Sequence, residues 1–322
     1  MAGPGGVIET ERLTRTFAGR VAVDRLDLCV GKGQVFGLLG PNGAGKTTTI
    51  RILATLLAPT SGAARIGGLD VTRDPGEVRR RLGYVAQTVA LQPNNLLTGR
   101  ENLEIEAALR HLPRGLCRRR AAEVLDVVGL TPHADRLIRE YSGGMRKRLD
   151  LAAGMLHRPE VLILDEPSLG LDVQSRHRIW DYVRGLRAEG VTVLLATNYL
   201  DEADRLCDCV TIIDAGRAVV TGTPDDLKRT VAADVVHVAT DSPERLRGAI
   251  GGRAWVRSIV ETGPAEIHVY VEDAAAALPE LIRAGVEAGV ELRRVTYTQP
   301  SLDDVFLLHT GHALREGDGA AP

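Results

Sequence analysis

The chain has 322 residues, of which 25% are charged and 44% are hydrophobic, and its formal net charge is −2 at pH 7. This length and balance are typical of a globular protein with about two domains. The small net charge and an aromatic content of 3% argue against a nucleic-acid partner. No apolar run reaches the roughly 18 residues of a membrane helix, and residues 1–12 lack a signal-peptide core. We therefore expect a cytosolic protein that acts at a membrane only through a partner.

From residue 7 to about residue 229 the chain alternates between short apolar strands and helices. Strands are expected at Val35–Leu39, Val161–Leu164, Val191–Ala196 and Val210–Ile213. A long helix is expected at Val173–Glu189. This alternation predicts an α/β fold with a largely parallel sheet. Between about residues 88 and 159 helical periodicity dominates, as in Arg100–His111 and Arg118–Val128, which predicts a helical subdomain.

A glycine-rich segment follows the first strand and fits the pattern G-x-x-x-x-G-K-[ST]. Its residues are Gly40, Pro41, Asn42, Gly43, Ala44, Gly45, Lys46, Thr47 and Thr48. A strand, this loop and then a helix form the context of a phosphate-binding loop, where backbone N–H groups and a helix N-terminus surround the phosphates. We expect Lys46 to reach the β- and γ-phosphates and the Thr47 hydroxyl to bind Mg²⁺. A glycine-rich turn with a surface lysine is the structural alternative.

A second anion site is indicated at Tyr141–Met145, just before a predicted helix at Arg146–Leu156. Ser142, Gly143 and Gly144 would place a hydroxyl and two backbone N–H groups at a helix N-terminus. An ordinary helix N-cap is the alternative for Ser142. A single nucleotide needs only one phosphate-binding device, so the presence of two in one chain requires an explanation.

Two carboxylates end the next apolar strand. In Leu162–Glu166 the apolar residues lead directly into Asp165 and Glu166. A strand that is apolar throughout is buried on both faces, and ligands lie at the carboxyl ends of such strands. We therefore expect Asp165 to hold Mg²⁺ directly or through water, and Glu166 to polarise the attacking water as a general base. A solvated acidic turn is the alternative.

The sequence changes character after Lys228. Strands are expected at Val235–Ala239, Ala254–Val260, Glu266–Val271 and Val290–Tyr297, and helices at Ser242–Ala249 and Ala274–Ala284. The order β-α-β-β-α-β predicts a small α+β, ferredoxin-like module over residues 230–310. A last helix is expected at Leu302–Thr310, and residues 311–322, rich in Gly and Ala, are expected to form a flexible tail.

Taken together, the motifs resemble those of the nucleotide-binding subunit of an ABC transporter. The resemblance covers residues 7–229 and rests on Gly40–Thr48, Ser142–Gly144 and Leu164–Pro167. It implies a P-loop NTPase fold, with a mixed-sheet core and the helical subdomain, and an ATPase that uses ATP and Mg²⁺. In that family two subunits form a head-to-tail dimer, and the Ser-Gly-Gly signature of one completes the ATP site of the other. By this resemblance the signature would bind the γ-phosphate held by the partner's Lys46, which explains the second anion site.

Further residues match motifs of the same family. Gln87 matches the glutamine that senses Mg²⁺ and links to the membrane subunit, and Phe17 matches the aromatic residue that stacks on adenine. For Phe17 a position in the core is the alternative. Ser168–Asp172 matches the loop that crosses the dimer interface. Asn198 stands where most relatives have a histidine that contacts the γ-phosphate. An asparagine amide can donate a hydrogen bond but cannot carry a proton, so we expect hydrolysis to depend more heavily on Glu166.

Three segments are similar to the daunorubicin-resistance type of exporter subunit, namely Leu97–Leu103, Tyr141–Ala153 and Ser301–Leu307. Met145 stands where glutamine is usual, a variant of one branch of the family. The resemblance implies two ATP-binding subunits, most simply a homodimer, with a separate six-helix permease at the cytoplasmic face of the membrane, without membrane insertion of this chain and without nucleic acid. The implied function is ATP hydrolysis that powers efflux of a drug-like or antibiotic compound. For Leu302–Leu308 a simple amphipathic closing helix is the alternative.

Two other functions stay open at this stage. Because of Asn198, the chain can also be interpreted as a catalytically weak, ATP-binding switch subunit of such a complex. A soluble ABC ATPase without a transport role is the other hypothesis. Ribosome-acting members carry two such domains in one chain and DNA-repair members carry long coiled coils, and neither pattern is found in this sequence. The exported compound, the permease and the homo- or heteromeric nature of the dimer cannot be read from the sequence.

Overall fold

The computed structural model describes residues 5–86, 95–232 and 234–310. By internal contacts the chain divides into two compact units, residues 1–218 (unit 1) and residues 219–322 (unit 2). The sequence prediction placed this division at residue 229. Helix α8 (Pro224–Val231) accounts for the difference, because it packs against helix α11 (Leu302–Thr310) within unit 2.

A six-stranded sheet has the order β10-β9-β3-β8-β7-β6, and its strands β3, β6, β7, β8 and β9 belong to unit 1. Its strands are β3 (Val35–Leu39), β6 (Leu82–Val85), β7 (Val161–Asp165), β8 (Thr192–Thr197), β9 (Cys209–Asp214) and β10 (Arg217–Gly222). Strand β3 runs parallel to β8 and β9, and β7 runs parallel to β6 and β8. Every residue of β3, β7 and β8 is buried, as expected for parallel strands covered on both faces. The predicted, largely parallel sheet is confirmed.

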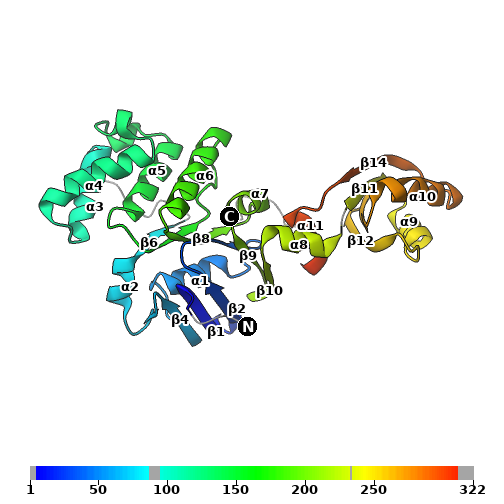
Figure 1. Ribbon diagram of the computed structural model, residues 1–322, viewed down its shortest axis with the longest axis horizontal. Helices are drawn as coiled ribbons and strands as arrows, with labels where there is room; N and C mark the ends of the chain where they lie inside the picture. The colour runs from blue at the N-terminus through cyan, green and yellow to red at the C-terminus, as the bar shows by residue number, and fades with distance from the viewer. Residues whose placement is uncertain (1–4, 87–94, 233, 311–322) are drawn as a thin grey trace. The chain divides into compact units, whose positions relative to one another are not determined.

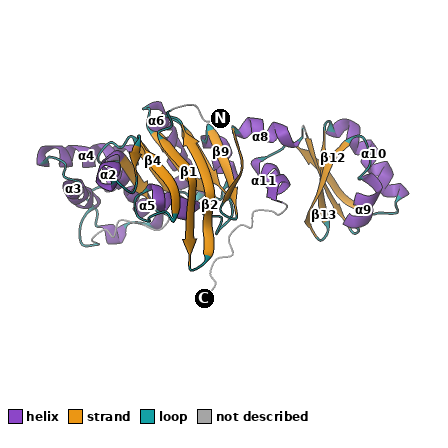
Figure 2. Ribbon diagram, turned by 90° about the horizontal axis from the view of Figure 1, so that it is seen from below, coloured by secondary structure: helices purple, strands orange, loops and turns teal. Residues whose placement is uncertain are grey.

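A second sheet of unit 1 is antiparallel and has the order β2-β1-β4-β5. Its strands are β1 (Ile8–Phe17), β2 (Arg20–Val30), β4 (Ser61–Ile66) and β5 (Leu69–Asp70), and Figure 2 shows β1, β2 and β4 side by side. The sequence analysis did not predict these strands, because exposed polar residues interrupt their apolar positions. Their buried side chains, among them Ile8 and Leu28, share one hydrophobic core with Phe36 and Ile163 of the six-stranded sheet.

The helices of unit 1 fall into two groups. Four helices accompany the sheets: α1 (Lys46–Leu53), α2 (Pro75–Arg81), α6 (Val173–Ala188) and α7 (Leu200–Leu206). The described residues 95–159 instead contain α3 (Gly99–Leu109), α4 (Arg114–Val127), α5 (Gly143–Gly154) and two short 3₁₀ turns, Thr131–His133 and Ile138–Glu140. Helices α3, α4 and α5 lie together on one side of the unit (Figure 1). The predicted helical subdomain is confirmed.

Unit 2 contains a four-stranded antiparallel sheet with the order β12-β13-β11-β14. Its strands are β11 (Asp234–Thr240), β12 (Val256–Gly263), β13 (Glu266–Val271) and β14 (Leu292–Thr298), and its other helices are α9 (Pro243–Ile250) and α10 (Ala274–Glu287). Alternate residues of β11 and β13, such as Val236 and Val269, form a core with Leu246 of α9 and Leu281 of α10. The order of elements and of strands confirms the predicted ferredoxin-like module.

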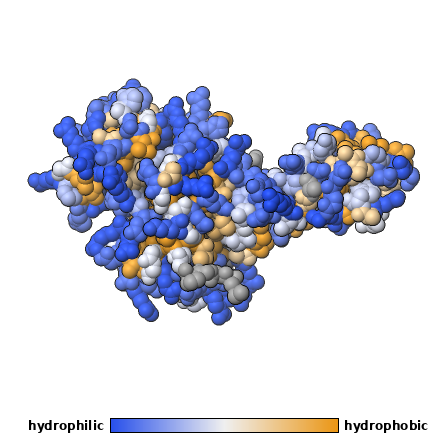
Figure 3. Space-filling model, in the orientation of Figure 1, coloured by the Kyte–Doolittle hydropathy of each residue, from blue (hydrophilic) through white to orange (hydrophobic). Residues whose placement is uncertain are grey.

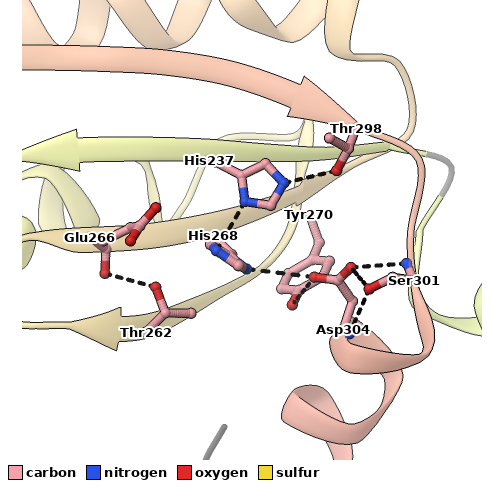
Figure 4. Close-up of polar contacts among 8 residues, drawn as sticks. All are labelled: His237, Thr262, Glu266, His268, Tyr270, Thr298, Ser301 and Asp304. Carbon is pink, nitrogen blue, oxygen red and sulfur yellow. Dashed lines mark hydrogen bonds and ion pairs between the residues drawn. The ribbon is translucent and has the colours of Figure 1, made fainter. Parts of the chain in front are cut away.

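Helix α11 is fastened to this sheet by one buried aspartate (Figure 4). Asp304 Oδ1 accepts a hydrogen bond of 3.1 Å from the Tyr270 hydroxyl, and its Oδ2 accepts from Ser301 N at 2.9 Å and from Ser301 Oγ at 2.7 Å. His268 Nδ1 lies 3.5 Å from Asp304 Oδ1. Of the two adjacent aspartates of this helix, Asp304 is buried and Asp303 is exposed.

The surface seen in Figure 3 is mostly hydrophilic, with hydrophobic residues gathered in small areas between polar ones. Such scattered apolar residues are normal on a protein surface. Within the ranges that the structure describes, no helix combines the length and the apolar character needed to cross a membrane.

Candidate functional site

The glycine-rich loop joins β3 to α1, which begins at Lys46. Gly40 has φ 155° and Gly45 has φ 104°, and a Cβ atom would lie 2.2 Å from the Ile213 carbonyl oxygen at Gly40 and 2.5 Å from the Ala22 carbonyl oxygen at Gly45. No other residue type fits that conformation and that close approach. Gly45 also caps α1 without any side-chain hydrogen bond, so the N–H groups of the first helical turn remain available to an anion.

Lys46 is buried beneath this loop, with 4% of its surface exposed. Its Nζ donates to the Gly40 carbonyl at 2.6 Å and to the Pro41 carbonyl at 3.1 Å, and it lies 3.8 Å from Glu166 Oε1. Burial lowers the pKa of Lys46, and the charges of Glu166 and Asp165 oppose that change. The lysine therefore lies inside the loop and next to both carboxylates.

Asp165, the last residue of β7, lies opposite Thr47. The Thr47 hydroxyl donates to Asp165 Oδ1 at 3.4 Å. Among the described groups Asp165 Oδ2 is buried and has no hydrogen-bond partner. Burial raises the pKa of Asp165, and the hydrogen bond from Thr47 opposes this change. A buried carboxylate oxygen without a partner is rare in folded proteins and indicates that something else binds there.

Glu166 follows at the edge where the parallel strands β3, β8 and β7 end side by side. It is 4% exposed, and its φ of 48° is in the left-handed region, which is costly for a residue other than glycine. Its N–H donates to the Ala196 carbonyl at 2.8 Å. Asn198 follows β8, the strand between β3 and β7, and its Oδ1 is also buried without a hydrogen-bond partner in the described part of the chain. The structure thus gathers Lys46, Asp165, Glu166 and Asn198 at one sheet edge, whereas Gln87 lies outside the described residues.

Ser142, Gly143 and Gly144 begin helix α5 of the helical subdomain. Ser142 is the N-cap, and its Oγ accepts a hydrogen bond of 3.3 Å from the Met145 N–H. Ser142 and Gly143 are exposed, and outside the neighbouring residues and the backbone of the same helix no described atom lies within 4 Å of the position that a Cβ on Gly143 would take. The N-cap role is therefore present, and the start of the helix is open on its outer side.

Phe17, at the end of β1, is 43% exposed, so its ring is outside the core. The Arg15 guanidinium carbon lies 4.5 Å from the centre of that ring. The loop after Glu166 contains both buried and exposed residues. Ser168 is 0% exposed and Leu169 is 39% exposed. Asp172 then starts α6 by accepting a hydrogen bond from the Ser175 N–H at 2.9 Å.

Lys147 is a buried charge near this site that the sequence analysis missed. Its Nζ donates to the Ala86 carbonyl at 2.7 Å, which ties helix α5 to the end of β6. Burial lowers the pKa of Lys147, while the charges of Asp150, Asp165 and Glu166 oppose that change. A lysine two residues before the largely apolar segment Leu149–Ala153 was a signal that could have been used.

Comparisons with known proteins found family models and relatives that cover most of the chain. The family described as ABC transporter matches residues 23–169, and the family described as ATP-binding protein DrrA1-3-like, C-terminal domain, matches residues 222–310. The daunorubicin resistance ATP-binding protein DrrA2 of Streptomyces coeruleorubidus is 45% identical over 96% of this chain and 96% of its own length. The daunorubicin/doxorubicin resistance ATP-binding protein DrrA of Streptomyces peucetius is 44% identical over 96% of this chain and 94% of its own. A solved ATP binding subunit of an ABC transporter has 30% identity and a TM-score of 0.63, covering 70% of this chain and 92% of that one.

Proposed function

Since this chain belongs to the ATP-binding subunits of ABC transporters, we propose that it uses ATP and Mg²⁺ to power export of a drug-like or antibiotic compound through a separate permease. It is an ATPase of the drug-resistance exporter type. The observation that carries the assignment of residues is the gathering of Lys46, Asp165 and Glu166 beside a loop whose helix start has no side-chain cap.

The nucleotide is assigned to the loop Gly40–Thr48. Its N–H groups and the start of α1 would surround the β- and γ-phosphates, and the Lys46 amine would exchange its two carbonyl acceptors for phosphate oxygens. The adenine is assigned to the exposed ring of Phe17, which also has the Arg15 guanidinium beside it.

Asp165 and Thr47 fit a Mg²⁺ ion. Both present oxygen atoms, the ligands that this ion prefers, and Asp165 Oδ2 is a buried oxygen with no hydrogen-bond partner among the described groups. Gln87, two residues after β6 in the sequence, is proposed as a further ligand by that position. A bound Mg²⁺ supplies charge neutralisation on the phosphates.

Hydrolysis is assigned to Glu166 and Asn198. The Glu166 carboxylate would orient the attacking water and accept its proton, while the Asn198 amide would donate to the γ-phosphate. Their side chains follow the ends of two neighbouring strands, β7 and β8. Asn198 keeps a donor where a histidine would have one, so Glu166 is left as the proton acceptor.

The dimer follows from the second anion site. Ser142, Gly143 and Gly144 lie at an open helix N-terminus, a geometry that suits a phosphate. We assign them to the γ-phosphate held by a second copy of this chain, in a head-to-tail homodimer. The complex would lie on the cytoplasmic face of the membrane with a six-helix permease, and only the permease would contact the exported compound.

The test is ATP hydrolysis by purified wild type and two variants, with oligomeric state measured by light scattering. Glu166→Gln should lose about 10²- to 10⁴-fold in kcat, the usual contribution of a general base, and should form dimers with ATP. Asn198→His should raise kcat by less than about tenfold, because asparagine already supplies a donor. Glu189→Gln removes an exposed carboxylate elsewhere in unit 1 and is the matched control.

Two outcomes would count against these assignments. Unchanged hydrolysis in Glu166→Gln would remove Glu166 as the base, and an ATP-loaded Glu166→Gln protein that stayed monomeric beside its permease would remove the dimer. If the wild type alone does not hydrolyse ATP and Asn198→His does, the chain is instead a weak, ATP-binding switch subunit.

A further inference from the structure

A fully buried glutamate lies between the two segments that carry the side chains assigned to hydrolysis. Glu202 belongs to α7 and is 0% exposed. A carboxyl group at that depth is costly unless it is neutral or hydrogen-bonded, so its neighbours indicate its role. One neighbour is Trp180 of α6, whose Nε1 donates to Glu202 Oε1 at 2.9 Å.

The other neighbours are two hydroxyl groups, one from each segment. The Ser168 and Thr197 hydroxyls both lie close enough to Glu202 to act on its pKa, and both residues are 0% exposed. Ser168 is in the segment that begins with Glu166, and Thr197 directly precedes Asn198. The Glu202 carboxyl group therefore lies next to both segments that carry the side chains assigned to hydrolysis, Glu166 and Asn198.

The surroundings of the Glu202 carboxyl group favour its neutral, protonated form. Burial raises the pKa of Glu202, and the nearby Thr197, Trp180 and Ser168 groups oppose that change only in part. Glu202 Oε2 and Ser168 Oγ are both buried, and neither has a hydrogen-bond partner in the described part of the chain. A protonated carboxyl group can accept a hydrogen bond from Trp180 on one oxygen and donate from the other. The second oxygen can therefore donate to the Ser168 hydroxyl when the two atoms come within hydrogen-bond distance.

Glu166 is held in a conformation that needs such support. Its φ of 48° is unfavourable, and its main chain is tied to β8 by the hydrogen bond to Ala196. That bond holds one end of the segment Glu166–Ser168. Glu202 lies at the other end of the same segment and also reaches Thr197, so it can keep the two segments in one register.

We propose that Glu202 is a positioning residue for ATP hydrolysis, whose buried carboxyl group fixes the Ser168 and Thr197 segments and thereby aims Glu166 and Asn198 at the γ-phosphate. It does not contact the nucleotide. The proposal rests on the roles proposed above for Glu166 and Asn198. Its own claim is that loss of this carboxyl group lowers kcat and leaves ATP binding unchanged.

The test compares steady-state hydrolysis, binding of a fluorescent ATP analogue and thermal unfolding in the full-length protein. Glu202→Leu should lower kcat by about tenfold or more, because small misplacements of catalytic groups are costly, and should change KM and analogue affinity less than twofold. Glu202→Gln keeps the shape and the neutral hydrogen-bonding group, so it should retain kcat within about twofold. Asp201→Asn removes the neighbouring exposed carboxylate of α7 and is the matched control.

A double variant separates positioning from simple damage to the fold. Glu202→Leu leaves the Trp180 N–H buried without its acceptor, which lowers stability. Trp180→Phe combined with Glu202→Leu removes both partners, so thermal stability should recover while kcat stays low. Recovery of kcat together with stability would overturn the proposal. So would a Glu202→Leu protein with wild-type kcat, or a Glu202→Gln protein as slow as Glu202→Leu. If Glu166→Gln also hydrolyses at the wild-type rate, the proposed function fails as well; if Glu166→Gln is inactive, only the role of Glu202 fails.

Discussion

Unit 1 and unit 2 each contain a buried aspartate, Asp165 and Asp304, and the two carboxyl groups differ in their hydrogen-bond partners and in the direction of their pKa shifts. Asp165 in unit 1 has one weak hydrogen bond from Thr47 and an Oδ2 that no described group satisfies. Asp304 in unit 2 accepts from the Tyr270 hydroxyl and from two groups of Ser301, with His268 beside it. Burial raises the pKa of Asp165, and the hydrogen bond from Thr47 and the charges of Lys46 and Lys147 do not outweigh it. Burial acts in the same sense on Asp304, but its neighbours, His268 and Ser301, outweigh it and the pKa is lowered.

The difference separates a site built for a ligand from a site built for the fold. A buried polar group without partners is costly, so it persists where a bound group supplies what is missing. A buried polar group with all its partners stabilises the contact between two elements, here α11 and the sheet of unit 2. The same residue type therefore indicates function in one unit and architecture in the other.

The largest effect that would sharpen this comparison is expected for Asp165→Asn. The change removes the charge assigned to the metal ion, so ATP hydrolysis should fall by about 10²-fold or more. The nucleotide-free protein should nevertheless become more stable, since burial raises the pKa of Asp165 and the change removes a charge that the folded state disfavours. Hydrolysis assays and urea unfolding without nucleotide measure the two effects. A variant that loses stability as well as activity would show that Asp165 is a structural residue after all.

The next effect is expected for Asp304→Asn, which is the counterpart of that change in unit 2. The amide keeps one acceptor oxygen but turns an N–H₂ group toward the donors of Ser301. Unit 2 should lose about 1–3 kcal/mol of stability, the usual cost of unpairing a buried hydrogen-bonding group, and hydrogen exchange of the α11 amides should accelerate. The kcat of the folded protein should stay within about twofold of wild type, because Asp304 has no assigned role in unit 1. Wild-type exchange rates in α11 would contradict the structural role.

Much of the site could be predicted from the sequence, because its parts are local. The loop Gly40–Thr48 and the strand ending in Asp165 are continuous patterns in which each residue type has a clear physical reason. The antiparallel strands β1 and β2 were missed because exposed polar residues interrupt their apolar positions. The contact between Trp180 and Glu202 joins two helices that are separated in sequence. Glu202 lies among other acidic residues, and nothing in that local sequence indicates that its side chain is buried.

The same limit applies to the pair Asp303 and Asp304. The sequence predicts a helix that contains both residues, but helical periodicity alone does not tell which of two adjacent aspartates points to the sheet. The orientation of the two aspartates depends on Tyr270 and His268, which belong to strand β13, an earlier part of the sequence. Local patterns therefore predicted the elements and the phosphate site, whereas the partners of buried charges required the tertiary structure.

The smallest effect, and the most direct test of the comparison, is the pH dependence of stability. The ordinary pKa of both carboxyl groups is 3.8. Asp304 has a lowered pKa in the folded state, so its stabilisation is present above pH 3.8 and is lost as the pH falls through the folded value. Asp165 has a raised pKa, so the folded state keeps a proton that the unfolded state loses, and stability declines as the pH rises from 3.8 toward the folded value.

Unfolding free energies of wild type and both variants, measured by denaturant titration across this pH range, should therefore diverge in opposite directions. The advantage of Asp165→Asn over wild type should grow as the pH rises above 3.8, whereas the disadvantage of Asp304→Asn should shrink as the pH falls below 3.8. Each variant is the control for the other, because both exchange one buried carboxyl group for an amide. Parallel curves for the two variants would mean that both aspartates are equally well paired, and the contrast between a ligand site and a structural site would then fail.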